Sequence, residues 1–338
     1  MIDKLVKEDI QQIAEWVNQK FCNDKKVLIT GGAGFLGSYL CDTFVHLGAN
    51  VVCLDNLSTG ILDNVDHLLK SENFRLTTED VSDFQSGEKF DCILHFASRA
   101  SPEDYQLYPV ETLRANSEGS FRMLELARKH DSKIMFASSS EIYGDPEVIP
   151  TPENYWGNVN HLGPRSCYVE GKRFSESLFV AYHRKYGLDV RIIRIFNTFG
   201  PRLRGDSFYG RVLSRFILQA QRGEDLTIYG DGSQTRSFCY ITDLVHAILL
   251  TLNNLEAKGQ VLNLGSSNEI SIMEAANKVL KVVGSRSGIS FFPLPEDDPK
   301  RRCPDTRKAK EILGWAPKVS LEDGLERTVL WFRKNPNI

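Results

Sequence analysis

The sequence has neither a strong excess of charge nor a long apolar run. Its 41 Lys and Arg residues against 44 Asp and Glu residues give a formal net charge of −3, so nothing in the balance demands a polyanionic partner. No run approaches the roughly 18 apolar residues that a membrane span needs. The first 24 residues carry several acids and are not typical of a signal peptide. We therefore expect a soluble chain with neither a nucleic acid nor a membrane as partner.

Cysteines are few and follow no disulfide or metal-binding pattern. The chain has seven, an odd number, at wide spacing and without a Cys-x-x-Cys pair. This argues against a disulfide framework and against a structural zinc site. Several lie in apolar runs, where a reduced cysteine packs as a small hydrophobic side chain. We expect a reducing compartment, the cytoplasm, and no metal.

Strand-like and helix-like segments alternate from Lys25 onward. Helical patterns, notably over 110–130 and 167–186, separate several short apolar runs. These runs are typical of strands buried on both faces of a sheet, and they cover 27–30, 51–54, 74–77, 92–96, 134–137 and 190–195. The alternation predicts an α/β fold, a Rossmann doubly wound parallel sheet, with a smaller α/β domain after it.

The expected organisation has three parts. Residues 1–24 form an N-terminal helical extension, because apolar residues there recur at helical spacing. Residues 25–196 form the first domain, with a return segment near 236–260. Residues 197–338, where glycine and proline are more frequent and strands at 226–229 and 261–264 mix with helices, form the second, interleaved domain.

A glycine pattern directly follows the first predicted strand. Gly31-x-x-Gly34-x-x-Gly37 opens a helix, and glycines there permit a tight turn and close approach of the backbone to a pyrophosphate. Asp55 ends the second strand, where a carboxylate can accept hydrogen bonds from ribose hydroxyls and would repel a 2′-phosphate, which favours NAD over NADP. The predicted cofactor-binding residues are Gly31, Gly34, Phe35, Leu36, Gly37, Asp55, Asn56, Asp80, Val81, Ala97, Tyr168 and Lys172.

A tyrosine and a lysine four residues apart form the expected catalytic pair. Tyr168 and Lys172 share one face of a predicted helix. A phenol is a poor base at neutral pH, and we expect the adjacent ammonium to favour the phenolate and lower the tyrosine pKa. Ser139, at the end of the fifth strand, supplies a hydroxyl to the same site.

With these motifs, the chain resembles the extended short-chain dehydrogenase/reductase family of nucleotide-sugar epimerases, dehydratases and decarboxylases. Within it, longer strings resemble the UDP-glucuronate decarboxylases over about residues 26–332; they include 138–146, 154–157, 163–173, 194–202, 234–238, 297–305 and 313–315. Ser140-Glu141 matches the decarboxylases, whereas dehydratases usually carry an Asp-Glu pair and simple epimerases a small or apolar residue.

The resemblance implies decarboxylation of UDP-glucuronate to UDP-xylose through a 4-keto intermediate, with NAD reduced and reoxidised within one turnover. It implies that 25–196 binds NAD and that 197–338 binds the nucleotide-sugar, and that the chain forms a homodimer through the helices of 110–130 and 167–186. The catalytic residues are then Tyr168, Lys172, Ser139, Glu141 and Arg302. The substrate-binding residues are Arg99, Ser139, Glu141, Asn197, Arg211, Tyr229, Arg236 and Arg302.

Two residues depart from the decarboxylase pattern. Arg99 stands where these enzymes usually have proline, and Val169 where they usually have aspartate. Arg99 is consistent with an altered sugar or with an extra cation for the same carboxylate. A UDP-sugar 4-epimerase or a related 4-keto enzyme therefore stays open as an alternative, and so does a non-catalytic NAD-binding regulatory protein.

Overall fold

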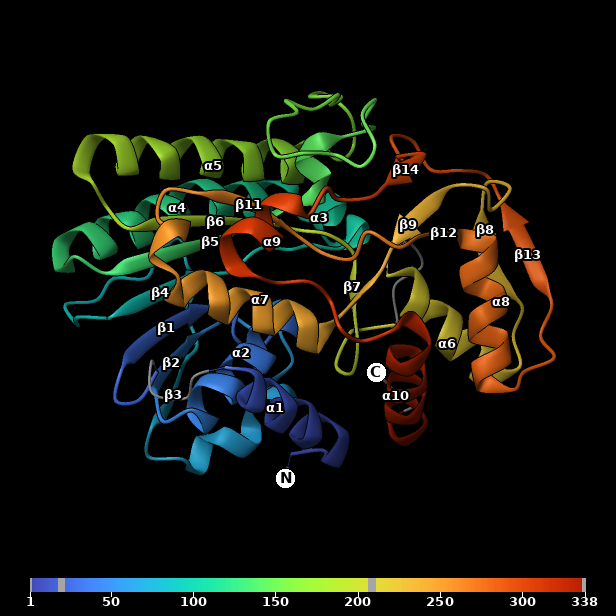
Figure 1. Cartoon of the computed structure of the whole chain (residues 1–338), viewed down its shortest axis with the longest axis horizontal. Coiled ribbons are helices and arrows are strands. Elements are labelled where there is room, and N and C mark those ends of the chain that lie inside the picture. The colour runs from blue at the N-terminus through green and yellow to red at the C-terminus, as the bar shows by residue number, and fades with distance from the viewer. Residues whose placement is uncertain (1, 18–21, 206–210, 336–338) are drawn as a thin grey trace.

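A parallel sheet of seven strands forms the larger part of the molecule (Figure 1). The computed structural model describes residues 2–17, 22–205 and 211–335. The strand order is β11-β6-β5-β4-β1-β2-β3, and every pairing is parallel. The strands are β1 Lys26–Thr30, β2 Asn50–Leu54, β3 Phe74–Thr77, β4 Cys92–His95, β5 Lys133–Ser139, β6 Val190–Ile195 and β11 Val261–Leu264. The doubly wound α/β fold is confirmed.

Helices cover both faces of this sheet (Figure 1). On one face lie α4 (Pro109–His130) and α5 (Ser166–Tyr186). On the other lie α2 (Phe35–His46) and α7 (Ile241–Asn253), with α1 (Lys4–Trp16) packed against both. The short helices α3 (Pro102–Leu107) and α9 (Arg307–Leu313) lie near α5 and β11, respectively. Short 3-10 turns complete this part at Leu62–Asn64, Asp66–Lys70, Ser140–Tyr143 and Leu255–Ala257.

The strand order reverses beside β1. From β1 the chain adds β2 and β3 on one side of this strand. It then crosses over and adds β4 and the later strands on the other side. In open parallel sheets, ligands bind in the crevice outside the carboxyl ends of the strands at such a point. The Val261–Leu264 strand, expected in the second domain, lies instead at the edge of this large sheet beside β6.

A smaller lobe stands beyond the carboxyl ends of the strands (Figure 1). In it, β8 (Leu226–Tyr229) pairs with β13 (Ile289–Phe292), and β9 (Thr235–Ser237) lies between β12 (Glu269–Ser271) and β14 (Arg301–Arg302). Helices α6 (Val212–Arg222), α8 (Ile272–Val283) and α10 (Leu321–Lys334) pack together there. The two-residue strands β7 (Thr198–Phe199) and β10 (Cys239–Tyr240) pair where the chain passes between the lobes.

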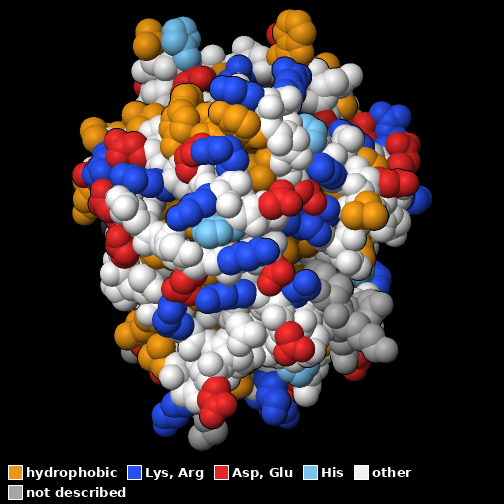
Figure 2. Space-filling view, turned by 90° about the vertical axis from the view of Figure 1, so that its left-hand side faces the viewer, with side chains coloured by type: hydrophobic (Ala, Val, Ile, Leu, Met, Phe, Trp, Pro, Cys, Tyr) orange, Lys and Arg blue, Asp and Glu red, His pale blue; other side chains and the backbone are white. Residues whose placement is uncertain are grey.

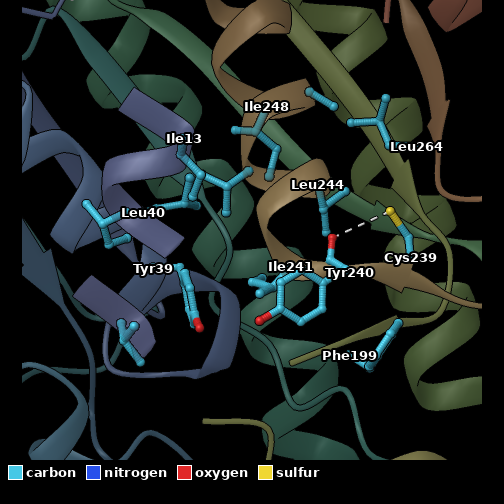
Figure 3. Close-up of a cluster of buried hydrophobic side chains, with 14 of the residues drawn as sticks. Ile13, Tyr39, Leu40, Phe199, Cys239, Tyr240, Ile241, Leu244, Ile248 and Leu264 are labelled. Carbon is cyan, nitrogen blue, oxygen red and sulfur yellow. Dashed lines mark hydrogen bonds between the residues drawn. The ribbon is translucent and has the colours of Figure 1, made fainter. Parts of the chain in front are cut away.

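The largest hydrophobic core joins the two lobes. Side chains of α1, α2 and α7 converge in it, as Figure 3 shows for Ile13, Leu40 and Ile248. Among them lies the fully buried carboxylate of Asp9, which accepts hydrogen bonds from the hydroxyls of Tyr39 and Tyr240 and pairs with Arg327 of α10. Through Asp9, the N-terminal helix α1 therefore connects α2 with α10 near the C-terminus.

The described residues include no helix that is both long and apolar enough to cross a membrane. All seven cysteines are free thiols. Within the same residues, no three His, Cys, Asp or Glu side chains are grouped as a metal site would require.

Candidate active site

One pocket between the sheet and the smaller lobe brings all the predicted site residues together. It lies at the carboxyl ends of the strands, where the reversal of strand order predicts a crevice. Its lining includes Gly31, Gly34, Phe35, Leu36, Gly37, Asp55, Asn56, Asp80, Val81, Ala97, Arg99, Ser139, Glu141, Tyr168, Lys172, Asn197, Arg211, Tyr229, Arg236 and Arg302.

The glycine loop forms a cradle that a side chain would fill. A Cβ added to Gly37 would lie 2.0 Å from the carbonyl oxygen of Gly31, and one added to Gly31 would lie 2.9 Å from the backbone of Ala97. Gly31 has a φ of 70°, which favours glycine. Helix α2 follows, and its N-cap, Gly34, offers no side chain to the first amides. These amides are free to face an anion, so the loop fits the diphosphate of a dinucleotide.

Two aspartates border the next part of the pocket. Asp55 directly follows β2, and its carboxylate accepts hydrogen bonds from the amides of Ala33 and Leu57 at 2.9 and 2.8 Å. Burial raises the pKa of this carboxyl group. Asp80 follows β3 by three residues and accepts a hydrogen bond from the side-chain amide of Asn56. Both carboxylates therefore belong to the same crevice as the glycine loop, as a dinucleotide site requires.

Tyr168 and Lys172 lie one turn apart on α5, facing the pocket. Burial raises the pKa of Tyr168 to about 12, although a hydrogen bond with Ser139 works in the opposite direction. Burial also lowers the pKa of Lys172 to about 7, and its ammonium donates to the carbonyl of Ala137 at 3.0 Å. Burial therefore raises the pKa of Tyr168, which is not lowered as expected, and Lys172 is not among the other groups that shift it, which are Ser139, Glu141 and Arg302.

A network of buried arginines and half-buried carboxylates also lines the pocket. Glu141 pairs with Arg302 at 2.9 Å and with Arg165 at 3.3 Å. Asp298 pairs with Arg165 at 2.8 Å and with Arg236 at 2.9 Å. Burial by itself would raise the pKa of the Glu141 carboxyl, but Arg302 and Arg165 outweigh it and hold the pKa below its usual value. Glu141 is therefore an ionised carboxylate at neutral pH.

Sequence reasoning did not assign three residues of this region. Arg165 and Asp298 lie within the segments 163–173 and 297–305 that carry the resemblance, but neither residue has a role assigned from the sequence. Tyr105 of α3 is fully buried, and its ring stacks on that of Tyr168 at 5.0 Å between centroids and 7° between planes. Arg165 lies three residues before Tyr168, so the helical period alone could have placed it near the catalytic pair.

Several buried polar atoms around this network have no hydrogen-bond partner among the described residues. They are Nε and Nη2 of Arg302, Nε of Arg99, the hydroxyl of Tyr105 and Oδ1 of Asn197. Leaving a buried donor unpaired costs about 1–3 kcal/mol, so such atoms indicate a ligand. The Arg99 guanidinium also lies 4.7 Å from the ring centroid of Tyr108. The set includes three cationic donors, which suits an anion with carboxylate or phosphate oxygens.

The remaining predicted residues line the part of the pocket in the smaller lobe. Arg211 precedes α6 and lies 3.5 Å from the carboxylate of Asp104. Tyr229 ends β8, and the guanidinium of Arg215 lies 5.1 Å from its ring centroid. Arg215 also lines the pocket and was not predicted. Val169 is buried in α5 and is absent from the pocket lining.

Comparison with known proteins gives a consistent picture. A profile of the NAD dependent epimerase/dehydratase family matches residues 27–265. UDP-glucuronic acid decarboxylase 1 of Xenopus tropicalis is 46% identical over 337 residues, covering 97% of this chain and 79% of that protein. UDP-glucuronic acid decarboxylase 1 of Danio rerio is 48% identical over 311 residues, covering 92% of this chain and 73% of that protein.

Solved structures resemble the fold over most of its length. The crystal structure of UDP-glucuronic acid 4-epimerase from Bacillus cereus, in complex with UDP-glucuronic acid and NAD, aligns with a TM-score of 0.83. It is 27% identical and covers 92% of this chain and 99% of its own.

Proposed function

Because the chain belongs to the NAD dependent epimerase/dehydratase family, we propose that it is an NAD-dependent nucleotide-sugar decarboxylase that converts UDP-glucuronate into UDP-xylose and carbon dioxide. Its sequence identity of 46% and 48% to UDP-glucuronic acid decarboxylases of two vertebrates supports this substrate. The observation that carries the proposal is the pairing of Glu141 with Arg302, beside the buried Tyr168, with unpartnered Arg302 donors.

The carboxyl group can leave only after the neighbouring carbon C4 is oxidised. A carboxylate on a saturated carbon has no acceptor for its electron pair, whereas a 4-ketone makes it a β-keto acid. Tyr168 must be a phenolate to take the proton of the 4-hydroxyl, and the positive charge of bound NAD⁺ would favour that form against the burial that raises its pKa. Ser139, hydrogen-bonded to Tyr168, positions the oxygen. When bound, NAD⁺ supplies the hydride acceptor for C4 and afterwards the hydride donor, so no net oxidation results.

Loss of carbon dioxide transfers the electron pair of the C5–carboxyl bond to the C4 oxygen. The resulting enolate oxygen is stabilised by the hydroxyls of Tyr168 and Ser139. C5 then needs a proton. An ionised Glu141 has no proton to give, so its role is to hold the water that protonates C5. Arg302, paired with Glu141, keeps this carboxylate and the water in place. Hydride return to C4 and the proton on Tyr168 complete UDP-xylose.

The other site residues follow from the charge of the substrate. UDP carries a diphosphate, and guanidinium groups bind phosphate oxygens through paired hydrogen bonds. We assign Asn197, Arg211, Tyr229 and Arg236 to UDP, and Arg99 to an anionic oxygen of the substrate. The twelve residues from Gly31 to Lys172 named above for the cofactor are assigned to NAD, and the 25–196 and 197–338 domains to cofactor and nucleotide-sugar.

We also infer a cytoplasmic homodimer. Helices α4 and α5 carry exposed apolar side chains, among them Phe121 and Phe174. Their ring centroids lie 6.1 Å apart, and the two residues are 44% and 43% exposed. Figure 2, which views the left-hand side of Figure 1, shows hydrophobic side chains grouped in its upper part, and Figure 1 places α5 near the top of the molecule. Sedimentation tests the dimer: the wild type should sediment as a dimer and a Phe121→Asp, Phe174→Asp double variant as a monomer. The seven free thiols support the reducing compartment.

Product analysis tests the function directly. The purified protein is incubated with UDP-glucuronate and NAD⁺, and the products are identified by mass spectrometry. We expect UDP-xylose and carbon dioxide without accumulation of NADH. A six-carbon product would indicate a 4-epimerase, and a 4-keto pentose with NADH an enzyme that releases the intermediate. No turnover of any UDP-sugar despite bound NAD would favour a regulatory protein and refute the proposal.

A further inference from the structure

A chain of four buried side chains runs behind the pocket, and none of the four lines it. The Oγ1 of Thr30 lies 2.9 Å from Nδ1 of His95, and Nε2 of His95 lies 3.2 Å from Oγ of Ser120. Ser120 Oγ in turn lies 3.1 Å from Oγ of Ser175. All four residues are at most 1% exposed, so water cannot replace a missing hydrogen bond.

The Thr30 end fixes one nitrogen of the imidazole. The amides of Phe96 and Ala97 both donate to Thr30 Oγ1, at 3.1 and 3.0 Å. A hydroxyl has two acceptor sites and one hydrogen. The Ala97 amide occupies one acceptor site, and the Phe96 amide, which also donates to the Thr30 carbonyl at 3.2 Å, approaches the other. The hydroxyl hydrogen therefore points to His95, and Nδ1 of His95 is an acceptor.

The Ser175 end fixes the other nitrogen independently. Ser175 Oγ lies 2.5 Å from the carbonyl of Asn116 and 2.9 Å from that of Gly171. Because carbonyl oxygens only accept, the Ser175 hydrogen is used there, and Ser120 must donate to Ser175. The remaining contact of Ser120 is then satisfied only if Nε2 of His95 carries a hydrogen and donates it.

Both ends require the same form of His95, the neutral tautomer with hydrogen on Nε2. A protonated ring would present Nδ1–H to a threonine hydroxyl with no free acceptor site. Burial also disfavours the imidazolium and lowers the pKa of His95 to about 3, and the Lys172 charge acts in the same direction.

The chain connects the elements that carry the cofactor and the catalytic groups. Thr30 directly precedes Gly31 of the glycine loop, and the Ala97 backbone that it binds is the one that approaches Gly31. At the other end, Ser175 lies three residues beyond Lys172 on α5. We propose that His95, as the neutral Nε2–H tautomer, is a positioning residue that holds the glycine loop and the β4 loop in register with α5.

The tautomer is the most direct test, and it does not depend on any variant folding. In ¹⁵N-labelled wild-type protein, the two ring nitrogens of His95 should report a bare Nδ1 and a protonated Nε2, unchanged across the neutral pH range. A titrating ring or the opposite tautomer would refute the proposal. This measurement needs no substrate, so its result is independent of the reaction proposed above.

Variants test the positioning role, and their kinetic part rests on the proposed function. His95→Leu removes both contacts, His95→Asn keeps an acceptor near Nδ1, and His95→Gln keeps a donor near Nε2. We expect His95→Leu to bind NAD about tenfold more weakly and to lower kcat by a similar factor, with KM for UDP-glucuronate unchanged. The amide variants should each recover part of both losses, and the exposed His161→Gln should match wild type.

The alternative outcome is a purely structural role. If His95→Leu lowered only the melting temperature and left NAD affinity and kcat at wild-type values, the positioning role would be wrong. Direct measurement of NAD binding keeps the two proposals separate, because it can be made on the protein even if no UDP-sugar is turned over.

Discussion

The two sides of the pocket are built from different chemistry. The cofactor wall (Gly31, Gly37, Asp55, Asp80 and Ala97) consists largely of backbone, and its carboxylates accept hydrogen bonds from neighbouring amides and side chains. Behind it, the neutral chain through His95 has every hydrogen used. The arginine wall (Glu141, Arg165, Arg236, Asp298 and Arg302) is a lattice of ion pairs with unpartnered donors on Arg302.

This difference matches the two ligands that we assign to the walls. The cofactor wall offers carboxylates that are already hydrogen-bonded and the uncapped first amides of α2, which suit the diphosphate of a dinucleotide. A substrate with three anionic groups is served by Arg302, whose Nε and Nη2 have no hydrogen-bond partner among the described residues, because desolvated donors bind an anion strongly. Tyr168 lines the same pocket, and in the proposed reaction it acts on the sugar carbon that exchanges hydride with the cofactor.

Removing the Tyr168 hydroxyl should have the largest effect, because both walls act through it. We expect Tyr168→Phe to lower turnover of UDP-glucuronate by about 10³-fold, within the range for loss of a general base. The ring and its stacking on Tyr105 are kept, so NAD and UDP binding should change little, as calorimetry can check. Normal turnover by this variant would overturn the mechanism.

Changing the charge of the arginine wall should separate decarboxylation from hydride transfer. Glu141→Gln leaves Arg302 and Arg165 without their shared carboxylate and should lower release of carbon dioxide by about 10²-fold. Reduction of NAD, followed by nicotinamide absorbance, should persist. Glu147→Gln, at an exposed position in the same loop, is the control. Equal loss of both steps would mean that Glu141 acts before decarboxylation.

Filling the cradle of the cofactor wall should affect NAD rather than the sugar. The Cβ of Gly37→Ala would lie 2.0 Å from the Gly31 carbonyl oxygen, and such overpacking costs about 1–3 kcal/mol. We expect weaker NAD binding and a lower melting temperature. Gly87→Ala has no atom within 4 Å of the added carbon and should behave as wild type. Unchanged NAD affinity in Gly37→Ala would contradict the cradle.

Arg99 tests whether the departure from the decarboxylase pattern extends the arginine wall. Arg99→Ala should raise KM for UDP-glucuronate about fivefold, the loss of one charge-assisted hydrogen bond, with kcat unchanged. The effect should shrink at high salt. Arg184→Ala, on the exposed end of α5, is the matched control. If Arg99→Ala changed NAD affinity instead, Arg99 would bind the cofactor and the assignment to the substrate would be wrong.

The smallest expected effect is a pH dependence of stability. The folded pKa of Glu141 lies below its usual 4.5. Its stabilising contribution is therefore complete above that value and is lost as pH falls through the folded pKa. We expect wild type to lose more stability than Glu141→Gln on acidification, because only the wild-type carboxylate must be protonated, and urea unfolding at several pH values measures this. Equal losses would show that the ion pairs do not depress this pKa.

Sequence reasoning located the cofactor wall better than the arginine wall. The glycine loop, Asp55 and the Tyr168–Lys172 pair are local patterns, in which spacing along one element fixes spacing in space. Asp298 lies 133 residues from Arg165, and no periodicity connects them. The His95 chain joins β1, β4, α4 and α5 through single hydroxyls, which carry no pattern in the sequence at all.

The parallel α/β sheet, the glycine loop and the helix that carries Tyr168 follow from local sequence, because each depends on apolar periodicity or on backbone freedom within a few residues. The place of Val261–Leu264 at the sheet edge and the charge states of the pocket residues depend instead on how distant segments pack. A pKa depends on burial and on neighbouring charges, and both arise when distant segments pack. Burial makes Tyr168 a weaker acid than a free phenol, and Arg302 and Arg165 keep Glu141 ionised.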